Sequence, residues 1–300
     1  MASAGLTQGW VAKRLPPRPL RAHKGTFGRL LIVAGSLEYA GAALLTGLGA
    51  MRTGVGVACL ATPETVGLRL LGVLPELTAM LLVEEAPGLT APAGWRRLAT
   101  EAPAYEALVI GPGLGRQPAT LRRARNFIGE LRHPAVVDAD ALVALAEVQR
   151  WWQPIKASLV LTPHPGEFAR LVRLPDGENL SDDDAQRAEA AQAAAARWGQ
   201  VVVLKGAHTV IAAPNGDLLR SDIATPALAT AGSGDVLAGA IGAFLAAGLS
   251  PFDAAGCGVA VHGAAGLLAE DRIGRAGVVA RDIANLLPNA IEQLRGGARA

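Results

Sequence analysis

The chain has 300 residues, of which 51% are apolar and 18% are charged, and its formal net charge is +2. A chain of this length and apolar content can form one large α/β domain or two small ones. The small net charge gives no reason to expect nucleic acid or an anionic membrane as a partner. We find no signal-peptide pattern and no apolar run long and pure enough to span a membrane.

The two cysteines, Cys59 and Cys257, stand far apart in apolar surroundings. This usage is typical of a reduced cytoplasmic protein and offers no metal-ligand spacing. Near the start of the chain, a cluster of prolines indicates that residues 1–23 form an extended arm.

From residue 29 onward, strand and helix patterns alternate. The predicted strands span 29–34, 56–61, 77–83, 105–110, 135–137, 158–161, 200–204, 210–213 and 218–220, the last two joined by a hairpin turn. Helices are predicted over 39–52, 91–100, 118–131, 140–148, 182–198, 236–245, 253–269 and 280–294. Two further helices begin at Thr62-Pro63 and near Glu167, and residues 84–90 are expected to form a loop.

This alternation predicts a single α/β domain over residues 1–300, with a mostly parallel central sheet and helices on both faces. The loops after the strands are rich in Gly, Pro, Asp and His. In a parallel sheet such loops lie at one edge, where open α/β sheets bind ligands, so we expect them to line one crevice. They span 35–36, 111–115, 138–140, 162–167, 205–209 and 231–235.

The sequence Ala-Gly-Ser-Gly-Asp at 231–235 precedes a helix and predicts a phosphate-binding loop. The first N–H groups of a helix lack partners within it, and with the helix dipole they attract anions. The loop consists of Gly232, Ser233 and Gly234, and its two glycines would let a phosphate approach the backbone closely. Asp235 then stands where it can accept the proton of an attacking hydroxyl. An ordinary helix start with an aspartate in its first turn is the alternative.

Two common nucleotide-binding motifs are missing from the sequence. The Gly-Pro-Gly-Leu-Gly run at 111–115 does not match the GxGxxG pattern, and no GxxxxGK[ST] loop occurs. The loop at 231–235 therefore indicates phosphoryl transfer by a different fold.

Other residues in these loops have both a functional and a structural interpretation. Lys205, one of only four lysines, could neutralise a phosphate or simply end a strand. His164, between two prolines, could contact a substrate or shape a turn. Glu167 could orient Mg²⁺ through water or cap its helix, and we favour the cap. For His208 and His262 a structural role is the first interpretation.

Taken together, the motifs resemble those of the ADP/ATP-dependent NAD(P)H-hydrate dehydratases, repair enzymes with the ribokinase-like fold. The resemblance runs in order from about residue 24 to residue 287. The motifs that carry it are KGTFG at 24–28, Gly35-Ser36, Tyr39 with 41–43, GPGLG at 111–115, DAD at 138–140, LTPHPGEF at 161–168, VVLKGAHTVIA at 202–212, ATAGSGDVLAG at 229–239 and His262-Gly263.

The resemblance implies a lyase that repairs the S epimer of NADH or NADPH hydrated at carbon 6 of the nicotinamide ring. Such an enzyme phosphorylates the hydroxyl from ADP or ATP with Mg²⁺, after which phosphate leaves and the double bond is restored. We expect ADP as the donor, because bacterial-type single-domain members resemble ADP users. Asp235 is implied as the base that deprotonates the hydroxyl.

The resemblance also implies which residues contact each ligand. Contacts to the hydrated cofactor are implied for Ala42, Gly113, His164 and Asp235. Contacts to the adenine nucleotide are implied for Lys205, Gly206, Ala207, His208, Thr209 and Gly234.

One stretch departs from the family pattern. Members often carry Asn-Pro-Gly before the phosphate loop, whereas this chain has Thr225-Pro226-Ala227. A side-chain amide donor is lost, and Ala227 is expected to adopt a positive φ less readily than glycine.

Partners and alternatives follow from the same resemblance. Some members are fused to a domain that interconverts the two hydrate epimers, and this chain has no room for one, so a separate epimerase is the expected functional partner. A homotetramer is also suggested. Two alternatives stay open: an alcohol kinase of the same fold acting on a vitamin precursor, and a non-catalytic nucleotide sensor.

Overall fold

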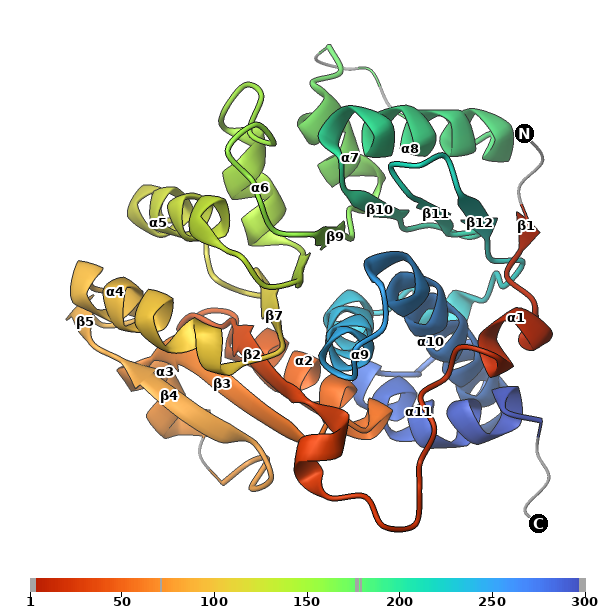
Figure 1. The fold of residues 1–300 in the computed structure, drawn as a ribbon, viewed down its shortest axis with the longest axis horizontal. Helices are drawn as coiled ribbons and strands as arrows, with labels where there is room; N and C mark the ends of the chain where they lie inside the picture. Colours follow the sequence, from red (N-terminus) through yellow and green to blue (C-terminus); the bar gives the residue numbers. More distant parts are fainter. Residues whose placement is uncertain (1–3, 71, 176–177, 179, 297–300) are drawn as a thin grey trace.

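The computed structural model describes residues 4–70, 72–175, 178 and 180–296. A ten-stranded sheet in the order β1-β12-β11-β10-β9-β8-β7-β2-β3-β4 runs through the molecule (Figure 1). Neighbouring strands are parallel, except that β11 is antiparallel to both β10 and β12. The strands are β1 (Ala4–Gly5), β2 (Arg29–Val33), β3 (Val57–Pro63), β4 (Thr78–Leu82), β7 (Ala107–Ile110), β8 (Ala135–Val137), β9 (Leu159–Leu161), β10 (Val201–Leu204), β11 (Val210–Ala212) and β12 (Leu218–Arg220).

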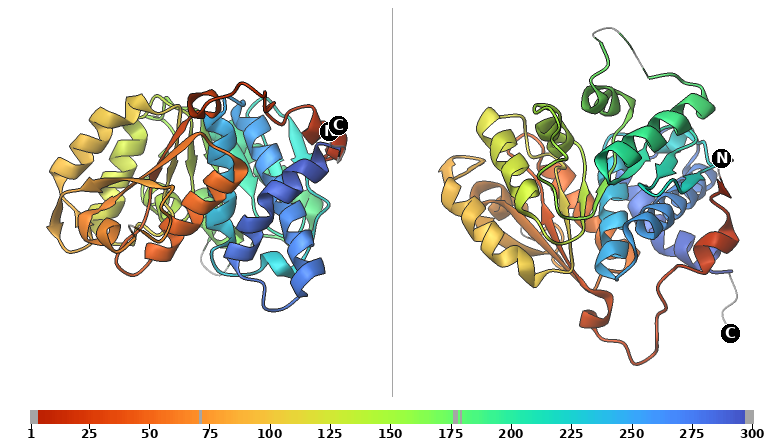
Figure 2. Two further views of the ribbon diagram at one scale, coloured as in Figure 1. Left: turned by 90° about the horizontal axis from the view of Figure 1, so that it is seen from below. Right: turned by 45° about the horizontal axis from the view of Figure 1, so that its top comes forward.

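Helices cover both faces of this sheet, so the predicted mostly parallel α/β architecture is confirmed. Because successive strand residues point to opposite faces, Leu30 and Ile32 enter one core while Leu31 and Val33 enter the other. The first core includes residues of α2 (Ala40–Thr53), α9 (Ser233–Ala246), α10 (Pro251–Ile273) and α11 (Ala280–Leu294). The second includes residues of α4 (Pro92–Glu101), α5 (Pro118–Glu130), α6 (Asp140–Ala146), α7 (Pro165–Val172) and α8 (Asp184–Trp198). Figure 2 shows the blue helices α9–α11 grouped on the side of the molecule away from the yellow α4.

Glycines allow α2 and α9 to pack with their backbones nearly in contact. A Cβ atom added at Gly239 of α9 would lie 2.1 Å from the carbonyl oxygen of Thr46 on α2. In the reverse direction, a Cβ atom at Gly49 would lie 2.5 Å from the carbonyl oxygen of Val236. The small residues of these helices therefore hold the start of α9, which carries the predicted phosphate loop, against α2.

The predicted extended arm over residues 1–23 is wrong for residues 4–12, and residues 1–3 lie outside the described part. Ala4 and Gly5 pair in parallel with β12 as β1, and α1 (Gln8–Ala12) follows. The Thr7 hydroxyl caps this helix by accepting from the Trp10 N–H, and Val11 is fully buried in the first core. A helix this short depends on such tertiary contacts, which no local pattern reveals.

Two smaller predictions also need correction. The helix expected at Thr62-Pro63 begins at Glu64 as α3 (Glu64–Leu70), because β3 continues through Pro63 and pairs with β4. The expected loop over 84–90 contains a hairpin of β5 (Glu84–Ala86) and β6 (Leu89–Thr90). Short 3-10 turns, η1 (Lys24–Phe27), η2 (Ala102–Ala104) and η3 (Pro226–Leu228), complete the described elements.

By length and composition alone, helix α10 is long and apolar enough to cross a membrane, and the mean hydropathy of its most apolar 18-residue window is 1.3. The prediction that no segment reaches this length and apolar character is therefore wrong. Within the fold, 72% of that window is buried. The apolar residues of this helix pack in the first core.

Replacing Gly239 by alanine is expected to lower the free energy of unfolding by about 1–3 kcal/mol, because the new methyl group must push α2 and α9 apart. Urea unfolding followed by circular dichroism measures the change.

A matched control is Gly129→Ala in α5, where an added Cβ atom meets no other atom within 4 Å. This change is expected to stabilise the protein by about 0.5–1 kcal/mol, because alanine favours the helix. Equal unfolding midpoints for the two variants would show that α2 and α9 do not pack as closely as described.

Candidate functional site

The loops that follow the parallel strands meet at one edge of the sheet, as predicted. The Gly35 N–H after β2 donates to the carbonyl oxygen of Pro112 after β7 at 2.9 Å. The Lys205 N–H after β10 donates to the carbonyl oxygen of Pro163 after β9, also at 2.9 Å. The carboxyl edge of the sheet is therefore a single, internally bonded surface.

Asp138 joins three of these loops. Its side chain is almost fully buried at the end of β8, and its Oδ1 accepts hydrogen bonds from Thr162 Oγ1 at 2.7 Å and Lys205 Nζ at 2.9 Å. The ammonium group also lies 3.9 Å from Glu167 Oε2. Sequence reasoning singled out the loop at 138–140 but gave Asp138 no site role. A carboxylate at the end of a buried strand was the signal available.

Ala139 adopts an unusual backbone conformation between Asp138 and Asp140, with φ 49° and ψ −122°. For a residue other than glycine, such a conformation costs on the order of 1–3 kcal/mol. Asp140 uses the resulting turn to accept from the Gly115 N–H at 3.0 Å and from Arg116 Nε at 3.1 Å. The loop after β7 is thereby tied to the loop after β8.

The predicted phosphate loop has the expected form at the start of α9. Gly232 adopts a left-handed conformation with φ 86°, and no side chain caps the helix. The Ser233 N–H, however, donates to the carbonyl oxygen of Thr230 at 3.2 Å. The Ser233 N–H is therefore already used within the turn that opens α9.

Asp235 stands in the first turn of α9 with strongly altered acidity. Burial, together with the negative charge of Asp138, raises the pKa of Asp235 to about 7, although Lys205 opposes this shift. A carboxylate with a pKa near the operating pH is suited to general-base chemistry.

Lys205 remains charged despite its burial. Burial lowers the pKa of Lys205, but the charges of Asp138 and Glu167 outweigh it, so the pKa is raised overall. A Cβ atom added at Gly234 would lie 3.4 Å from Lys205 Nζ. The ammonium group thus lies beside the phosphate loop.

Glu167 and His164 form a reciprocal cap on α7. His164 Nδ1 accepts from the Gly166 N–H at 3.0 Å, while Glu167 Oε2 accepts from the His164 N–H at 2.9 Å. The favoured interpretation of Glu167 as a helix cap is confirmed. Burial and the charge of Lys205 lower the pKa of His164, so its ring is neutral at pH 7. Among the residues that the structure describes, no group of three His, Cys, Asp or Glu side chains could hold a metal ion.

A cavity of about 680 Å³ opens beside these groups. Most of the residues predicted to contact the nucleotide line it, namely Lys205, Gly206, Ala207, Thr209 and Gly234, together with His164, Ser233 and His262. His208 is not part of the lining, and its Nδ1 lies 2.7 Å from Asp184 Oδ2.

Ala42 and Gly113, predicted to contact the hydrated cofactor, adjoin each other. A Cβ atom added at Gly113 would lie 2.9 Å from the Cβ atom of Ala42. Neither residue lines the 680 Å³ cavity, and neither does Asp235. In addition to burial, the negative charges of Asp138 and Asp140 raise the pKa of Asp235. Asp140 also accepts a hydrogen bond from the Gly115 N–H, and it therefore links the phosphate loop to the region of Gly113.

The stretch that departs from the family pattern is accommodated without strain. Thr225 Oγ1 accepts from the Ala227 N–H at 3.1 Å and donates to Glu270, so a hydroxyl caps η3. Ala227 is not among the residues with positive φ in the described part of the chain. This agrees with the expectation that alanine adopts a positive φ less readily than glycine, and Ala227 belongs instead to a 3-10 turn.

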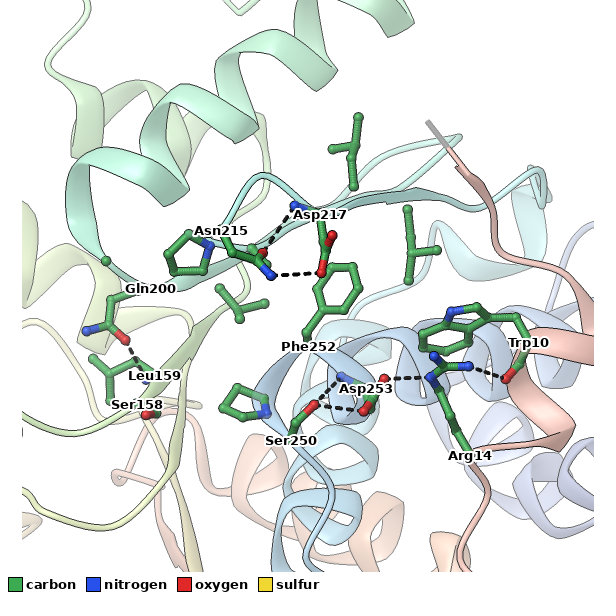
Figure 3. Close-up of a pocket in the computed structure, with 17 residues that line it drawn as sticks. Trp10, Arg14, Ser158, Leu159, Gln200, Asn215, Asp217, Ser250, Phe252 and Asp253 are labelled. Atoms are coloured by element: carbon green, nitrogen blue, oxygen red, sulfur yellow. Dashed lines mark hydrogen bonds and ion pairs between the residues drawn. The ribbon is translucent and has the colours of Figure 1, made fainter. Parts of the chain in front are cut away.

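A second cavity of about 730 Å³ lies at the opposite edge of the sheet, near the amino ends of β9 and β10 (Figure 3). None of the predicted site residues lines it. Several of its polar side chains already have partners: Arg14 Nε lies 2.6 Å from Asp253 Oδ1, and Gln200 Oε1 accepts from the Leu159 N–H at 2.6 Å. The cavity beside Lys205 is accordingly the candidate site.

Comparison with known proteins identifies the family of this chain. A family model described as NAD(P)H-hydrate dehydratase matches residues 30–289. The bifunctional NAD(P)H-hydrate repair enzyme of Moorella thermoacetica is 39% identical over 289 residues, covering 96% of this chain and 54% of that protein. The chain thus spans about half the length of this bifunctional relative. The ADP-dependent (S)-NAD(P)H-hydrate dehydratase of Bacillus subtilis is 36% identical over 284 residues, covering 94% of this chain and 95% of that protein.

Solved structures lead to the same group. The crystal structure of an ADP/ATP-dependent NAD(P)H-hydrate dehydratase from Bacillus subtilis, grown with ATP/Mg²⁺, superposes with a TM-score of 0.84 at 35% identity, covering 98% of this chain and 99% of that one. A ribokinase-like superfamily protein from Enterococcus faecalis, 23% identical, superposes with a TM-score of 0.76, covering 96% of this chain and 95% of that one, and it confirms the predicted fold. Because the family model matches residues 30–289 and a relative of similar length is 36% identical, the chain belongs to the NAD(P)H-hydrate dehydratase family.

Proposed function

We propose that this protein dehydrates the S epimer of hydrated NADH or NADPH, with ADP as the phosphoryl donor, and so restores the reduced cofactor. The observation that carries the proposal is Asp235, a carboxylate with a pKa of about 7 in the first turn of a phosphate-loop helix. The Bacillus subtilis relative of similar length is named for the same ADP-dependent reaction.

The chemistry would proceed in two steps. Asp235 accepts the proton of the hydroxyl at carbon 6, whose oxygen bonds to the terminal phosphorus of ADP as AMP departs. In the second step the bond between carbon 6 and oxygen breaks, and phosphate leaves with the electron pair of that bond. The lone pair of the ring nitrogen then forms a second bond to carbon 6. Loss of a proton from the neighbouring ring carbon restores the double bond.

The residues around the cavity and those in the region of Gly113 would together hold both ligands. Lys205 and the amino end of α9 counter the charge of the nucleotide phosphates. The nucleotide would lie along 205–209 and Gly234, and the hydrated cofactor beside Ala42, Gly113 and His164. His208, paired with Asp184, would contact the nucleotide through its backbone.

Mg²⁺ would supply further neutralisation of the phosphate charge. Since the described residues contain no three-ligand cluster, we propose that the ion is bound mainly by the nucleotide phosphates and water. The Bacillus subtilis structure was obtained with ATP/Mg²⁺. A role for Glu167 through water would be secondary to its cap.

We further propose that residues 1–300 act as one ribokinase-like domain in a cytoplasmic homotetramer, with a separate epimerase as functional partner. The family resemblance supports these features, and relatives named as bifunctional repair enzymes support a link between two repair activities.

Hydrated NADH offered with ADP is expected to disappear with formation of NADH, AMP and phosphate in equal amounts. Absorbance at the NADH band, with a phosphate assay, measures both, and ATP in place of ADP compares the donors. A stable phosphorylated product without free phosphate would instead support the alternative of an alcohol kinase.

Asp235→Asn is expected to lower kcat by about 10²–10⁴-fold, because the amide cannot accept the hydroxyl proton. ADP affinity, measured by calorimetry, should change little. Loss of turnover with retained ADP binding would identify Asp235 as a catalytic base and exclude the alternative of a non-catalytic nucleotide sensor. Near-normal turnover would show that Asp235 is not the base.

The activity is also expected to depend on pH through Asp235. Because the base acts only when deprotonated and its pKa is raised to about 7, kcat/KM should rise with pH and level off above that value. Below pH 7 the loss should approach roughly tenfold per pH unit. A profile flat from pH 5.5 to pH 8 would contradict the assignment.

A further inference from the structure

His262 of α10 reaches the phosphate loop through Ser233. His262 Nε2 lies 3.0 Å from the carbonyl oxygen of Ser233 and 3.1 Å from its Oγ atom. Both side chains are buried, with 7% and 5% of their surfaces exposed, and both residues line the 680 Å³ cavity with Lys205 and Gly234. The sequence alone suggested only a structural role for this histidine.

The geometry determines which ring nitrogen carries the proton. A carbonyl oxygen can only accept, so a nitrogen 3.0 Å away from it must donate, and Nε2 is therefore protonated. Burial lowers the pKa of His262 to about 4, so the ring is neutral and Nδ1 carries no proton. Nε2–H is shared between the carbonyl oxygen and Oγ of Ser233, both of which accept.

This arrangement leaves the hydroxyl proton of Ser233 unused. Among the hydrogen bonds of the described residues, Ser233 Oγ has no partner other than His262 Nε2, which already donates. The Ser233 N–H is also occupied, because it donates to Thr230. What Ser233 can offer to a ligand in the cavity is the proton of its side chain.

We propose that the Ser233 hydroxyl donates a hydrogen bond to an oxygen of the phosphoryl group being transferred, and that His262 is the positioning residue that turns it that way. The inference rests on the proposed function and adds a side-chain donor to the backbone groups of the loop. A fixed donor in a buried site is most effective where negative charge develops in the transition state.

The test compares Ser233→Ala with Ser233→Thr, which keeps a hydroxyl. Ser233→Ala is expected to lower kcat by about 10²-fold, the usual cost of losing one such donor. The KM for ADP should change little, because the lost interaction is specific to the transition state. Ser233→Thr should recover most of the rate, and a wild-type kcat for Ser233→Ala would overturn the proposal.

The role of His262 is tested by removing its donor in two backgrounds. His262→Leu should lower kcat in the wild-type chain but cause little further loss in Ser233→Ala, because both changes remove the same interaction. His262→Gln, whose amide can donate to the same carbonyl, should be less impaired and guards against failure of the leucine variant to fold. A full additional loss in the Ser233→Ala background would indicate a structural role and overturn the positioning role.

Two further measurements complete the test. His133→Gln, placed before β8 at the opposite edge of the sheet, serves as the control and should keep wild-type kcat. In ¹⁵N NMR spectra, the ring of His262 should show a protonated Nε2 and a bare Nδ1 from pH 5.5 to pH 8. The reverse tautomer would overturn the proposal.

Failure of the proposed function can be told apart from failure of this inference. If the wild-type protein does not consume hydrated NADH, the variants are compared by their calorimetric affinity for AMP with vanadate, in which vanadate stands in for the phosphoryl group transferred from ADP. If only Ser233→Ala binds more weakly, the proposed contact of the Ser233 hydroxyl is supported although the proposed reaction is not. Equal affinities in Ser233→Ala and Ser233→Thr would overturn the proposed contact.

Discussion

The ion pair between Lys205 and Asp138 holds the carboxyl edge of the sheet together. It connects the ends of β10 and β8, and the hydroxyl of Thr162 brings in the end of β9. Removing two charges from water is costly, and it is tolerated only where hydrogen bonds satisfy the remaining lone pairs and protons. Here Asp138 Oδ1 has two donors, and Glu167 lies within 3.9 Å of the ammonium group. The loops that form the site therefore depend on one buried cation and its carboxylate partner.

Burial and the charges around this pair together set the pKa of the candidate base. Burial makes ionisation of Asp235 costly, and the negative charges of Asp138, Asp140 and Glu167 add to that cost. Lys205 reduces this cost without cancelling it, so Asp235 titrates near neutrality instead of near its ordinary value. An anionic nucleotide would be expected to avoid such a site, and the amino end of α9 compensates by directing its dipole toward the cavity.

Prediction from the sequence succeeded where a local pattern carries enough information. The strand at 29–34, the helix at 118–131 and the hairpin at 210–220 appear within a residue or two of the expected bounds, because their apolar periodicity is strong. It failed at residues 4–12 and at Thr62-Pro63, where pairing with a distant strand decides the structure. It also missed the membrane-like composition of α10, whose apolar residues pack in the first core.

The sequence by itself determined the alternation of strands and helices, the loops at one sheet edge and the Gly-Ser-Gly-Asp start of α9. These features follow from periodicity and turn chemistry, which act over a few residues. Only the tertiary structure decided that Asp138 pairs with Lys205 and that His262 reaches Ser233 from α10. These contacts join residues from separate elements, and whether two such groups come within hydrogen-bonding distance depends on how the elements pack. For that reason the chemistry of each candidate residue could be named early, whereas its protonation and its partners could not.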